Sequence, residues 1–265
     1  MIKIISWNIN SLRLRIDLLK NLITKTNPDI LCLQEIKVAN CDFPFDEVKK
    51  LGFDFIEFDG EKSYNGVAIF SKFPLKNIVK IDVENYQQKR HIKASISMPF
   101  GEINLHNFYI PAGGDVADVN LNPKFAHKIK FLEWMMKYFS TESRENNIIL
   151  GDFNIAPNPN DVWSHRQLIN VVSHTEIEVM LLNKIKEAGE FIDCHRHFVN
   201  ENDKIYSWWS YRALEPFKSN RGRRLDHIWI SNNLIHKLQS TKIYSDFRVE
   251  KNPSDHVPIE VSLSI

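Results

Sequence analysis

The sequence predicts an α/β protein built from two packed β-sheets flanked by helices. Roughly ten short segments rich in β-branched and aromatic residues are typical of strands, whereas only three or four segments show helical spacing of apolar residues. This number of strands exceeds what one doubly wound sheet needs, so two sheets fit better. No Gly/Ser-rich or Pro-rich linker divides the chain, and we expect one domain over residues 1–265.

Three segments carry apolar residues at the three-to-four spacing of an amphipathic helix. The first is expected over residues 12–25. The second starts at Pro123, a residue that suits the first helical turn, and runs to about residue 139. The third covers residues 176–188 and ends at Gly189, a common helix terminator. We expect these helices to flank the sheets.

Several of the strand-like segments end or begin at a polar residue. Asn8, Glu35, Tyr109 and Asp152 each follow an apolar run, and the pair 255–256 precedes the last run. A polar residue where a strand meets a loop often presents a functional group, although acids and Asn are also ordinary turn residues. Together they indicate a polar, metal-assisted site at one rim. Strands are expected near residues 2–7, 29–34, 66–71, 77–83, 91–98, 102–109, 147–151, 205–209, 226–231, 241–246 and 257–263.

Composition and charge limit the classes of function. The chain is 43% hydrophobic and 25% charged, which suits a globular protein with a sizeable core. Its net charge of +1 gives no overall basic field, so any nucleic-acid contact must come from local basic groups. Three cysteines at no metal-like spacing indicate reduced thiols, and no apolar run approaches the length of a membrane span. We expect a soluble, intracellular protein.

Glu35 is the best candidate for a ligand of a hard cation. Mg²⁺ binds few protein oxygens and keeps several waters, so one or two carboxylates with an amide oxygen are sufficient. Asn8 is expected to supply the amide oxygen and Asp255 a second carboxylate. The segment 194–197 contains one cysteine and two histidines, but no second pair lies at the spacing of a zinc site, so ordinary loop residues are the preferred interpretation.

The segment Gly151–Asn154 combines a carboxylate and an amide on one side of an extended chain. Asp152 and Asn154 alternate with Phe153, which is expected to point to the core. Such a pair suits a base that takes a proton from water and a donor that holds a phosphoryl oxygen. His256 adds an imidazole, and Asp226 is placed to fix its tautomer and charge.

Six motifs occur in order along nearly the whole chain: Ser6–Asn10, Leu33–Glu35, Asn107–Pro111, Gly151–Asn154, Arg224–His227 and Ser254–Pro258. Together they resemble the motifs of the exonuclease III family of abasic-site endonucleases, within the endonuclease/exonuclease/phosphatase superfamily. Each motif alone is weakly specific, but six in the same order are strongly specific. A further segment, Tyr206–Arg212, resembles the aromatic stretch at the family's abasic pocket.

The resemblance implies a four-layered sandwich, with two packed, mostly antiparallel or mixed β-sheets between helices and the site at one edge. It implies a Mg²⁺-dependent nuclease, for which Mn²⁺ should substitute, that cuts the phosphodiester 5′ to abasic sites. The bacterial type is also a 3′→5′ exonuclease on duplex DNA and removes 3′-blocking groups. The expected partner is double-stranded DNA with abasic sites, nicks or blocked 3′ ends. We expect a cytoplasmic monomer without membrane partners, associated with the nucleoid when it acts on DNA.

The resemblance also assigns the metal ligands. It implies that Glu35 binds Mg²⁺, with Asn8 and Asp255 directly at the ion or behind its first ligands. Asp152 and Asn154 are further candidate metal ligands. A divalent ion on one side of a phosphate can neutralise the charge that develops during hydrolysis.

The remaining catalytic roles follow from the same resemblance. Asp152 is implied to orient or deprotonate the attacking water. The scissile phosphate would be held by Asn154, Tyr109 and His256, with Asp226 supporting His256. In-line displacement at phosphorus asks the protein mostly for positioning and charge neutralisation, which these groups can supply.

Basic and aromatic residues between the aromatic stretch and Asp226 are expected to bind duplex DNA. Arg223 stands where the family often has an apolar residue, which leaves Trp208 and Leu225 as the expected walls of the abasic pocket. This departure leaves the balance between abasic cleavage and exonuclease action open. A solvated loop beside core tryptophans is the alternative. The expected DNA contacts are Arg212, Arg223 and Arg224, with Lys218 and Arg221 in the same cluster and Trp163, His165 and Arg166 as additional candidates. Arg90 is expected either to contact phosphate or to be structural.

Two other classes of function remain as alternatives. Other phosphoester hydrolases of the superfamily share the core residues, but secreted nucleases would carry a leader and disulfides, and lipid hydrolases an exposed apolar loop. A catalytically weak DNA-binding module would have lost Glu35, Asp152, Asp226 or His256, and all four are present. We therefore expect a DNA-repair nuclease.

Overall fold

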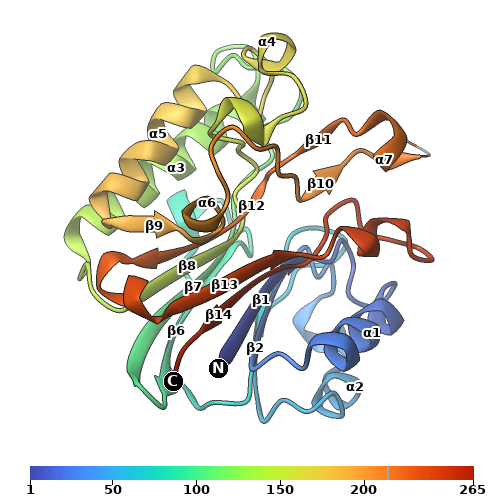
Figure 1. The fold of residues 1–265 in the computed structure, drawn as a ribbon, viewed down its shortest axis with the longest axis vertical. Coiled ribbons are helices and arrows are strands. Elements are labelled where there is room, and N and C mark those ends of the chain that lie inside the picture. Colours follow the sequence, from blue (N-terminus) through green and yellow to red (C-terminus); the bar gives the residue numbers. More distant parts are fainter. Residues whose placement is uncertain (214) are drawn as a thin grey trace.

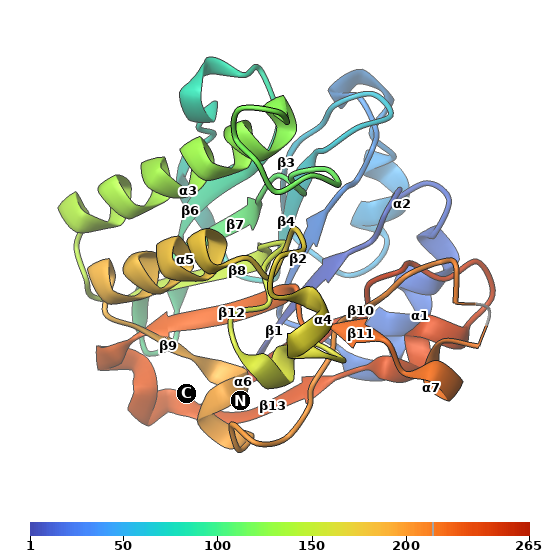
Figure 2. The same cartoon turned by 90° about the horizontal axis from the view of Figure 1, so that it is seen from above.

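Strands with apolar residues on both faces form two six-stranded sheets in the computed structural model, which describes residues 1–213 and 215–265. The sheets pack face to face and helices cover both outer faces, which gives four layers (Figures 1 and 2). The predicted fold class is therefore confirmed.

The strand order makes both sheets mixed. Within the described residues, β1 and β2 run parallel, as do β7 and β8, and the other paired neighbours run antiparallel. The first sheet has the order β13 (Leu238–Ile243), β14 (Ile259–Leu263), β1 (Ile2–Asn8), β2 (Ile30–Gln34), β4 (Val67–Ser71) and β3 (Phe55–Asp59). The second has the order β5 (Leu75–Val79), β6 (His91–Met98), β7 (Gly101–Tyr109), β8 (Asn147–Asp152), β12 (Asp226–Ser231) and β9 (Phe191–Asp193). A short ribbon pairs β10 (Trp208–Trp209) with β11 (Gly222–Arg223).

Amphipathic helices cover the outer faces of the sheets. The first sheet is covered by α1 (Ile16–Thr26) and α2 (Phe45–Lys49), and the second by α3 (Pro123–Thr141) and α5 (Glu176–Ala188). The chain starts α3 with Asn122, whose side chain accepts the N–H of Lys124, and α5 with a capping box between Thr175 and Glu178. Shorter helices are α4 (His165–Leu168), α6 (Cys194–Phe198) and α7 (Pro216–Ser219), and 3₁₀ turns lie at Asn40–Asp42, Val83–Asn85, Pro159–Asp161, Asn232–Lys237 and Ser245–Val249.

The core follows the two-residue period of the strands. In β1, Ile4 packs between the sheets, whereas Ile5 packs against α1 and α2. In β12, Ile228 faces the first sheet and Trp229 faces α3 and α5. Each such side chain contributes about 1.5–3 kcal/mol through its burial, so both faces of both sheets hold the layers together.

Some element bounds differ from the sequence expectation. The first helix begins at Ile16 rather than at residue 12, because residues 12–15 form turns. The strand expected at 205–209 is reduced to Trp208–Trp209, and before it Ser207 exchanges backbone hydrogen bonds with Arg223 and Val257. The strands expected at 77–83 and 241–246 lie earlier, at Leu75–Val79 and Leu238–Ile243, while β3 and β9 were not predicted.

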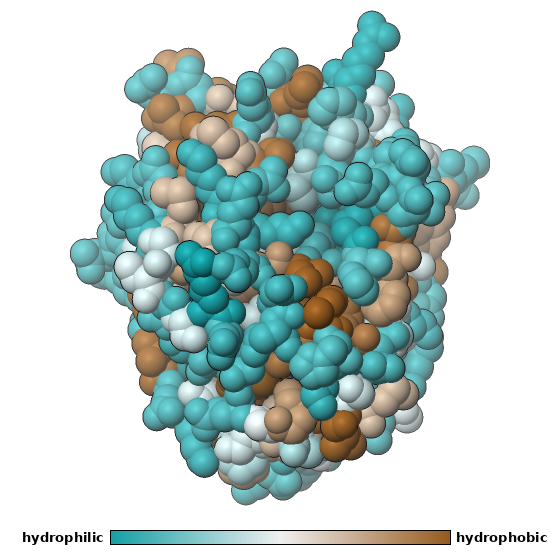
Figure 3. Space-filling view, turned by 60° about the vertical axis from the view of Figure 1, so that its left-hand side comes forward, coloured by the Kyte–Doolittle hydropathy of each residue, from teal (hydrophilic) through white to brown (hydrophobic). Residues whose placement is uncertain are grey.

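No helix among the described residues has both the length and the apolar character needed to cross a bilayer. Hydrophilic side chains predominate on the face drawn in Figure 3, and hydrophobic ones form small, separate patches there. The long apolar stretches of the sequence are instead used between the layers.

Candidate active site

The strand ends that carry polar residues meet at one edge of the two sheets. In the parallel pair β7–β8, Tyr109 lies opposite Asp152, and in the antiparallel pair β8–β12, Asp226 lies opposite Asp152. Asn8, at the end of β1, reaches Asp152 from the other sheet. The site therefore lies where the two sheets come together.

Gly151 allows β8 to approach β7 just before the site. Its φ is +134°, and a Cβ added there would lie 1.9 Å from the carbonyl oxygen of Phe108, so only glycine fits. The next residues alternate as the sequence predicted: Phe153 packs under α3 and α5, while Asp152 and Asn154 turn toward the site. Asn154 itself has a left-handed φ of 53°, which asparagine tolerates better than most residues.

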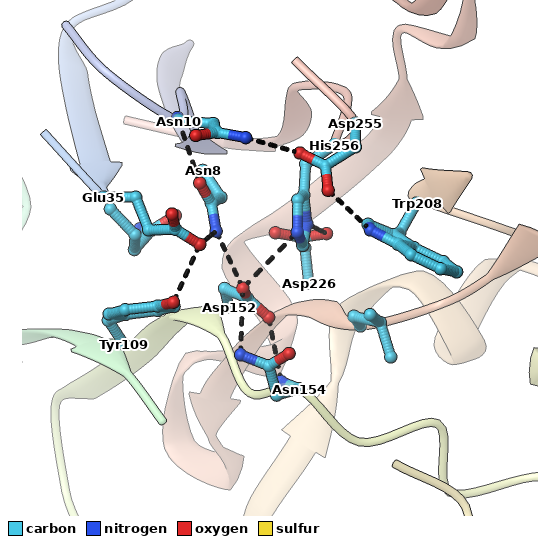
Figure 4. A network of polar contacts seen from close by, with 12 residues as sticks. Asn8, Asn10, Glu35, Tyr109, Asp152, Asn154, Trp208, Asp226, Asp255 and His256 are labelled. Carbon is cyan, nitrogen blue, oxygen red and sulfur yellow. Dashed lines mark hydrogen bonds and ion pairs between the residues drawn. The ribbon is translucent and has the colours of Figure 1, made fainter. Parts of the chain in front are cut away.

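Asp152 is the centre of the polar network (Figure 4). Its Oδ2 accepts hydrogen bonds from Asn8 Nδ2 at 2.8 Å and Asn154 Nδ2 at 3.1 Å, and lies 3.6 Å from His256 Nε2. Its Oδ1 accepts the backbone N–H of Asn154 at 2.9 Å. Burial raises the pKa of Asp152 to about 7, although the nearby His256 opposes the rise. A carboxyl group with such a pKa is suited to exchange protons near neutral pH.

Glu35 lies on the opposite side of Asn8 from Asp152. Its Oε1 accepts Asn8 Nδ2 and the hydroxyl of Tyr109, both at 2.8 Å, and its Oε2 lies 2.7 Å from Lys37 Nζ. Burial alone would raise the pKa of Glu35, but the charge of Lys37 and these donors outweigh it and lower the pKa. Glu35 is therefore an anion, and its uncommon left-handed φ of 51° aims it into the site.

Tyr109 is fixed from both sides. Burial, reinforced by the charge of Glu35, raises the pKa of Tyr109 well above its ordinary value, so the phenol remains a neutral donor. Arg90 lies 4.6 Å over the Tyr109 ring and donates to its carbonyl oxygen at 3.2 Å. Arg90 thus supports the site, which corresponds to the structural one of its two expected roles.

His256 and Asp226 form a buried pair opposite Glu35. His256 Nδ1 lies 2.8 Å from Asp226 Oδ2, which also accepts the Ser207 hydroxyl at 2.6 Å. Burial alone would lower the pKa of His256, but Asp226 and Asp152 outweigh it and hold the pKa well above the ordinary value. The ring is therefore an imidazolium whose Nε2 faces Asp152.

Asp255 lies between Trp208 and Asn10 at the site. It accepts Trp208 Nε1 on Oδ2 and Asn10 Nδ2 on Oδ1, both at 3.0 Å. The carbonyl oxygen of the Asn10 side chain accepts Lys37 Nζ at 2.6 Å. Asn10 and Lys37 therefore connect Asp255 to Glu35 across the site.

Several of these side chains line a cavity of about 250 Å³. One side is polar and charged, and the other contains the aromatic and apolar groups predicted to form a pocket. An adjoining groove of about 530 Å³ shares Trp208 and Arg223 with the cavity and includes Arg212. The cavity is lined by Glu35, Tyr109, Asn154, Trp208, Leu225 and His256, among others.

The oxygen-rich donor set fits a hard cation. The ammonium of Lys37 already contacts Glu35, so this carboxylate accepts positive charge in its present position. Asp255 and the carbonyl oxygen of the Asn154 side chain border the same cavity, and no described residue donates to that Asn154 oxygen. Asn8 differs from expectation: its Nδ2 faces Glu35 and Asp152, because its Oδ1 accepts the N–H of Asn10 at 3.1 Å.

A second group, formed by Asp152, Asp226 and His256, also has ligand atoms within 4.8 Å of one another. Both ring nitrogens of His256 in this group face carboxylates, Nδ1 toward Asp226 and Nε2 toward Asp152. A protonated imidazole offers no lone pair to an ion. Asn154 also differs from its expected role as a phosphate donor, since its amide hydrogens are used by Asp152 and the carbonyl oxygen of Ile110.

The structure corrects the interpretation of Arg224. The side chain is buried, donates to both carboxylate oxygens of Asp161 at 2.8 Å, and reaches Asp193 at 2.7 Å. It is therefore a structural cation rather than a DNA contact. Arg212 is exposed, and Arg223 is half-buried with its guanidinium 5.4 Å over the Trp208 ring.

Other candidates fall outside the cavity. Around Cys194, no group of metal-ligating side chains forms among the described residues, and the thiol is buried, so the zinc alternative is not supported. His165 pairs with His174 at 2.8 Å, while Trp163 carries Arg221 over its ring at 4.7 Å beside the groove.

Sequence reasoning missed three residues of the network. Lys37, Ser207 and Asn10 were given no role of their own at the site, yet they bind Glu35, Asp226 and Asp255 respectively. The available signal was position: each lies within two residues of a predicted site residue or inside a quoted motif.

Comparisons with known proteins show the family of this chain and relatives with the same fold. Residues 5–256 match the endonuclease/exonuclease/phosphatase family. The chain is 34% identical to exodeoxyribonuclease III of Haemophilus influenzae over 97% of this chain and 98% of that protein. Two solved structures each have a TM-score of 0.91 over 100% of both chains: an AP endonuclease from Archaeoglobus fulgidus, at 31% identity, and the 3′ phosphatase NExo from Neisseria bound to a product DNA hairpin, at 28%.

Proposed function

Because the chain belongs to the endonuclease/exonuclease/phosphatase family, we propose that it is a Mg²⁺-dependent DNA-repair nuclease. It would hydrolyse the phosphodiester 5′ to abasic sites in duplex DNA and act on 3′ ends as an exonuclease and end-cleaning phosphodiesterase. The observation that carries this proposal is the placement of Asp152 Oδ2 between Asn8 and the imidazolium of His256, beside the cavity. Relatives named exodeoxyribonuclease III, AP endonuclease and 3′ phosphatase support these activities.

Glu35 would hold the metal ion, with Asp255 and the carbonyl oxygen of the Asn154 side chain bordering the same cavity. When bound, Mg²⁺ would polarise a phosphoryl oxygen and neutralise charge that develops in the transition state. Oxygen ligands of this kind also suit Mn²⁺, which should substitute for it.

The chain's own groups would supply the rest of the chemistry. Asp152 would take the proton of the attacking water, in an orientation fixed by Asn8 and Asn154. His256, held protonated by Asp226, would neutralise a non-bridging oxygen of the phosphate. Water would then add to phosphorus as the bond to the 3′ oxygen breaks, with one proton of the water passing to Asp152. The departing 3′ oxygen would take a proton from surrounding water and leave as a hydroxyl.

The pocket side of the cavity would bind the nucleotide that lacks a base. Trp208 and Leu225 supply its apolar surface, and Arg223 supplies a cation beside them. Arg212, exposed in the adjoining groove, would contact the DNA backbone. The charged Arg223 also suits a terminal phosphate, so we propose that 3′-phosphate removal accompanies abasic cleavage.

A duplex with one abasic analogue and a labelled 5′ end tests the proposal directly. Incubation with Mg²⁺ should give incision immediately 5′ to the analogue, leaving a 3′ hydroxyl on the labelled fragment. A matched duplex with a 3′-phosphate at a nick should be converted to the hydroxyl. If the protein leaves the duplex uncut but rapidly hydrolyses a phosphoinositide or sphingomyelin, it is instead another type of phosphoester hydrolase.

Removal of the metal should abolish turnover. We expect no incision in excess chelator and full recovery on addition of Mg²⁺ or Mn²⁺. Without the metal, the phosphate loses the positive charge that would neutralise its developing negative charge. Glu35→Gln should raise the Mg²⁺ concentration needed for half-maximal rate, and Glu57→Gln, which alters an acid outside the cavity lining, serves as its control. Undiminished cleavage in chelator would overturn the metal role.

A further inference from the structure

A fully buried ion pair lies beneath the loops that carry the catalytic groups. Lys128 of α3 and Glu178 of α5 have no exposed side-chain surface, and Lys128 Nζ lies 2.5 Å from Glu178 Oε1. The same Nζ donates to the carbonyl oxygens of Asn154 at 2.8 Å and Ala112 at 3.3 Å. All three protons of the ammonium group are therefore used, and they connect the loop after β7 to the loop after β8.

Glu178 extends this connection to a third loop. Its carboxylate accepts the N–H of Ser173 at 2.9 Å, the N–H of Thr175 at 3.1 Å and the Thr175 hydroxyl at 2.6 Å. Ser173 has a left-handed φ of 84°, which is uncommon for a residue with a side chain, so its turn depends on such bonds. The Ser173 hydroxyl in turn accepts Arg223 Nη1 at 2.6 Å.

The residues held in this way form one wall of the cavity, called here the Ser173 wall: Ala112, Asn154, Ser173 and Arg223. Backbone packing against the pair is tight, because a Cβ added at Gly113 would lie 2.9 Å from both Lys128 Cδ and Val172 Cγ1. Asn154 also donates to Asp152 Oδ2 at 3.1 Å. A shift of the pair would therefore move both the wall and the proposed base.

We propose that the Lys128–Glu178 pair positions the Ser173 wall and, through Asn154, the carboxylate of Asp152, and thereby sets the preference for a nucleotide without a base. This inference rests on the proposed function. Packing does not explain the pair, because apolar residues of similar volume would fill the space without desolvating two charges. Such residues could not donate to Asn154 and Ala112 or accept from Ser173. Neither member lines the cavity, so both are positioning residues.

Three variants and one control separate positioning from folding. Lys128→Met leaves Glu178 buried and unpaired, Glu178→Gln keeps the size but removes the charge, and Lys128→Met/Glu178→Met removes both charges. Lys130→Met removes the same charge from an exposed position of α3 two residues away. For each protein we would measure the unfolding temperature, single-turnover kcat on the abasic duplex, and binding of abasic-analogue and undamaged duplexes in chelator by fluorescence anisotropy.

The double variant should recover the unfolding temperature that Lys128→Met loses, because no buried charge is left unpaired. Its binding preference for the abasic analogue should nevertheless fall about tenfold. Its kcat should fall on the order of 10²-fold, the range expected when a catalytic group is misplaced by about 1 Å. Lys130→Met should match the wild type in all three measurements.

A folded double variant with wild-type preference and wild-type kcat would overturn the inference. If the double variant does not fold, Glu178→Gln decides: unchanged preference and kcat in that folded protein overturn the inference equally, and a loss of both supports it. A wild-type protein that does not incise the abasic duplex would contradict the proposed function instead, and the binding preference in chelator would still test the pair. If the wild type neither incises nor prefers the abasic analogue, both proposals fail.

Discussion

Asp152 receives two amide donors and faces an imidazolium, yet burial still brings its pKa to about 7. A carboxyl group of this kind is ionised in part of the molecules at neutral pH and can accept a proton without a large energetic penalty. Its neighbours Asn8 and Asn154 fix its orientation, so loss of the carboxylate charge should affect the chemical step and leave the shape of the site nearly unchanged.

Asp152→Asn should therefore abolish turnover while leaving duplex binding nearly intact. Asparagine has the same shape but cannot take a proton from water, and loss of a general base typically slows a reaction by about 10²–10⁴-fold. Single-turnover rates measure the chemical step, and anisotropy in chelator measures binding. Cleavage at the wild-type rate would remove Asp152 from the mechanism, and a parallel loss of binding would indicate disruption of the site instead.

Asp226→Asn should make activity sensitive to alkaline pH. Asp226 is one of the two main charges that hold the pKa of His256 well above its ordinary value, against the opposing effect of burial. Without that charge the pKa of His256 falls, so the imidazolium loses its proton as the pH rises through the lowered pKa, and the cation at the phosphate is lost. The check is the pH profile of kcat/KM.

Ser207→Ala provides the matched control for that variant. The Ser207 hydroxyl donates to the same Asp226 oxygen that faces His256, but it carries no charge. Its removal should therefore leave the alkaline limb of the profile close to that of the wild type. Identical profiles for Asp226→Asn and the wild type would show that the charge on His256 is not needed.

At the scale of elements, the pairing of β8 with β7 and β12 places Tyr109 and Asp226 beside Asp152. The sequence predicted the strands and the residues at their ends, because apolar runs and polar termini are local patterns. It could not predict which strands pair, because register depends on contacts between distant segments. The partly exposed β3 and the three-residue β9 were missed because both lack a clear local signal.

The same limit explains how Arg224 was misinterpreted. In the sequence it belongs to a basic cluster, but its partners Asp161 and Asp193 lie 63 and 31 residues away. Lys37 also donates to Asn10 over 27 residues, and this second contact is one that a local pattern could not predict. Local patterns therefore predicted which polar residues lie at strand ends, whereas the long-range ion pairs and hydrogen bonds of Arg224 could not be predicted from them.

Arg224→Met should lower the stability of the fold, whereas Arg212→Ala should weaken DNA binding. Arg224→Met leaves the buried Asp161 and Asp193 with a lost partner, so the free energy of unfolding should fall by about 3–5 kcal/mol. Arg212→Ala, at an exposed position, should leave stability unchanged and weaken duplex binding. The slope of the logarithm of the binding constant against the logarithm of the salt concentration should become smaller in magnitude by about one. Thermal unfolding and anisotropy at several salt concentrations test both expectations. A fully stable Arg224→Met protein with weakened binding would restore its role as a DNA contact.

For the whole molecule, the outer face of the second sheet contains two histidines that the proposed reaction does not use. His91 and His106 are buried beneath α3, with ring nitrogens 3.2 Å apart, and His91 stacks on Phe108. Burial, with a contribution from Lys93, lowers the pKa of His91 to about 3 and lowers that of His106 well below its ordinary value. The folded protein therefore keeps both rings neutral under conditions in which unfolded histidine takes up a proton.

Acidification should therefore destabilise the fold through these two rings. Below about pH 6.5 the unfolded chain binds protons at His91 and His106 that the native protein does not bind, so stability present above pH 6.5 is lost as the pH falls toward about 3. Each histidine should contribute a slope of about 1.4 kcal/mol per pH unit within that window. Urea unfolding between about pH 6.5 and about pH 4.5 should give a shallower slope for His91→Phe, by about one proton. His236→Gln, at an exposed position, should keep the wild-type slope, and equal slopes for all three proteins would show that the buried pair does not control acid stability.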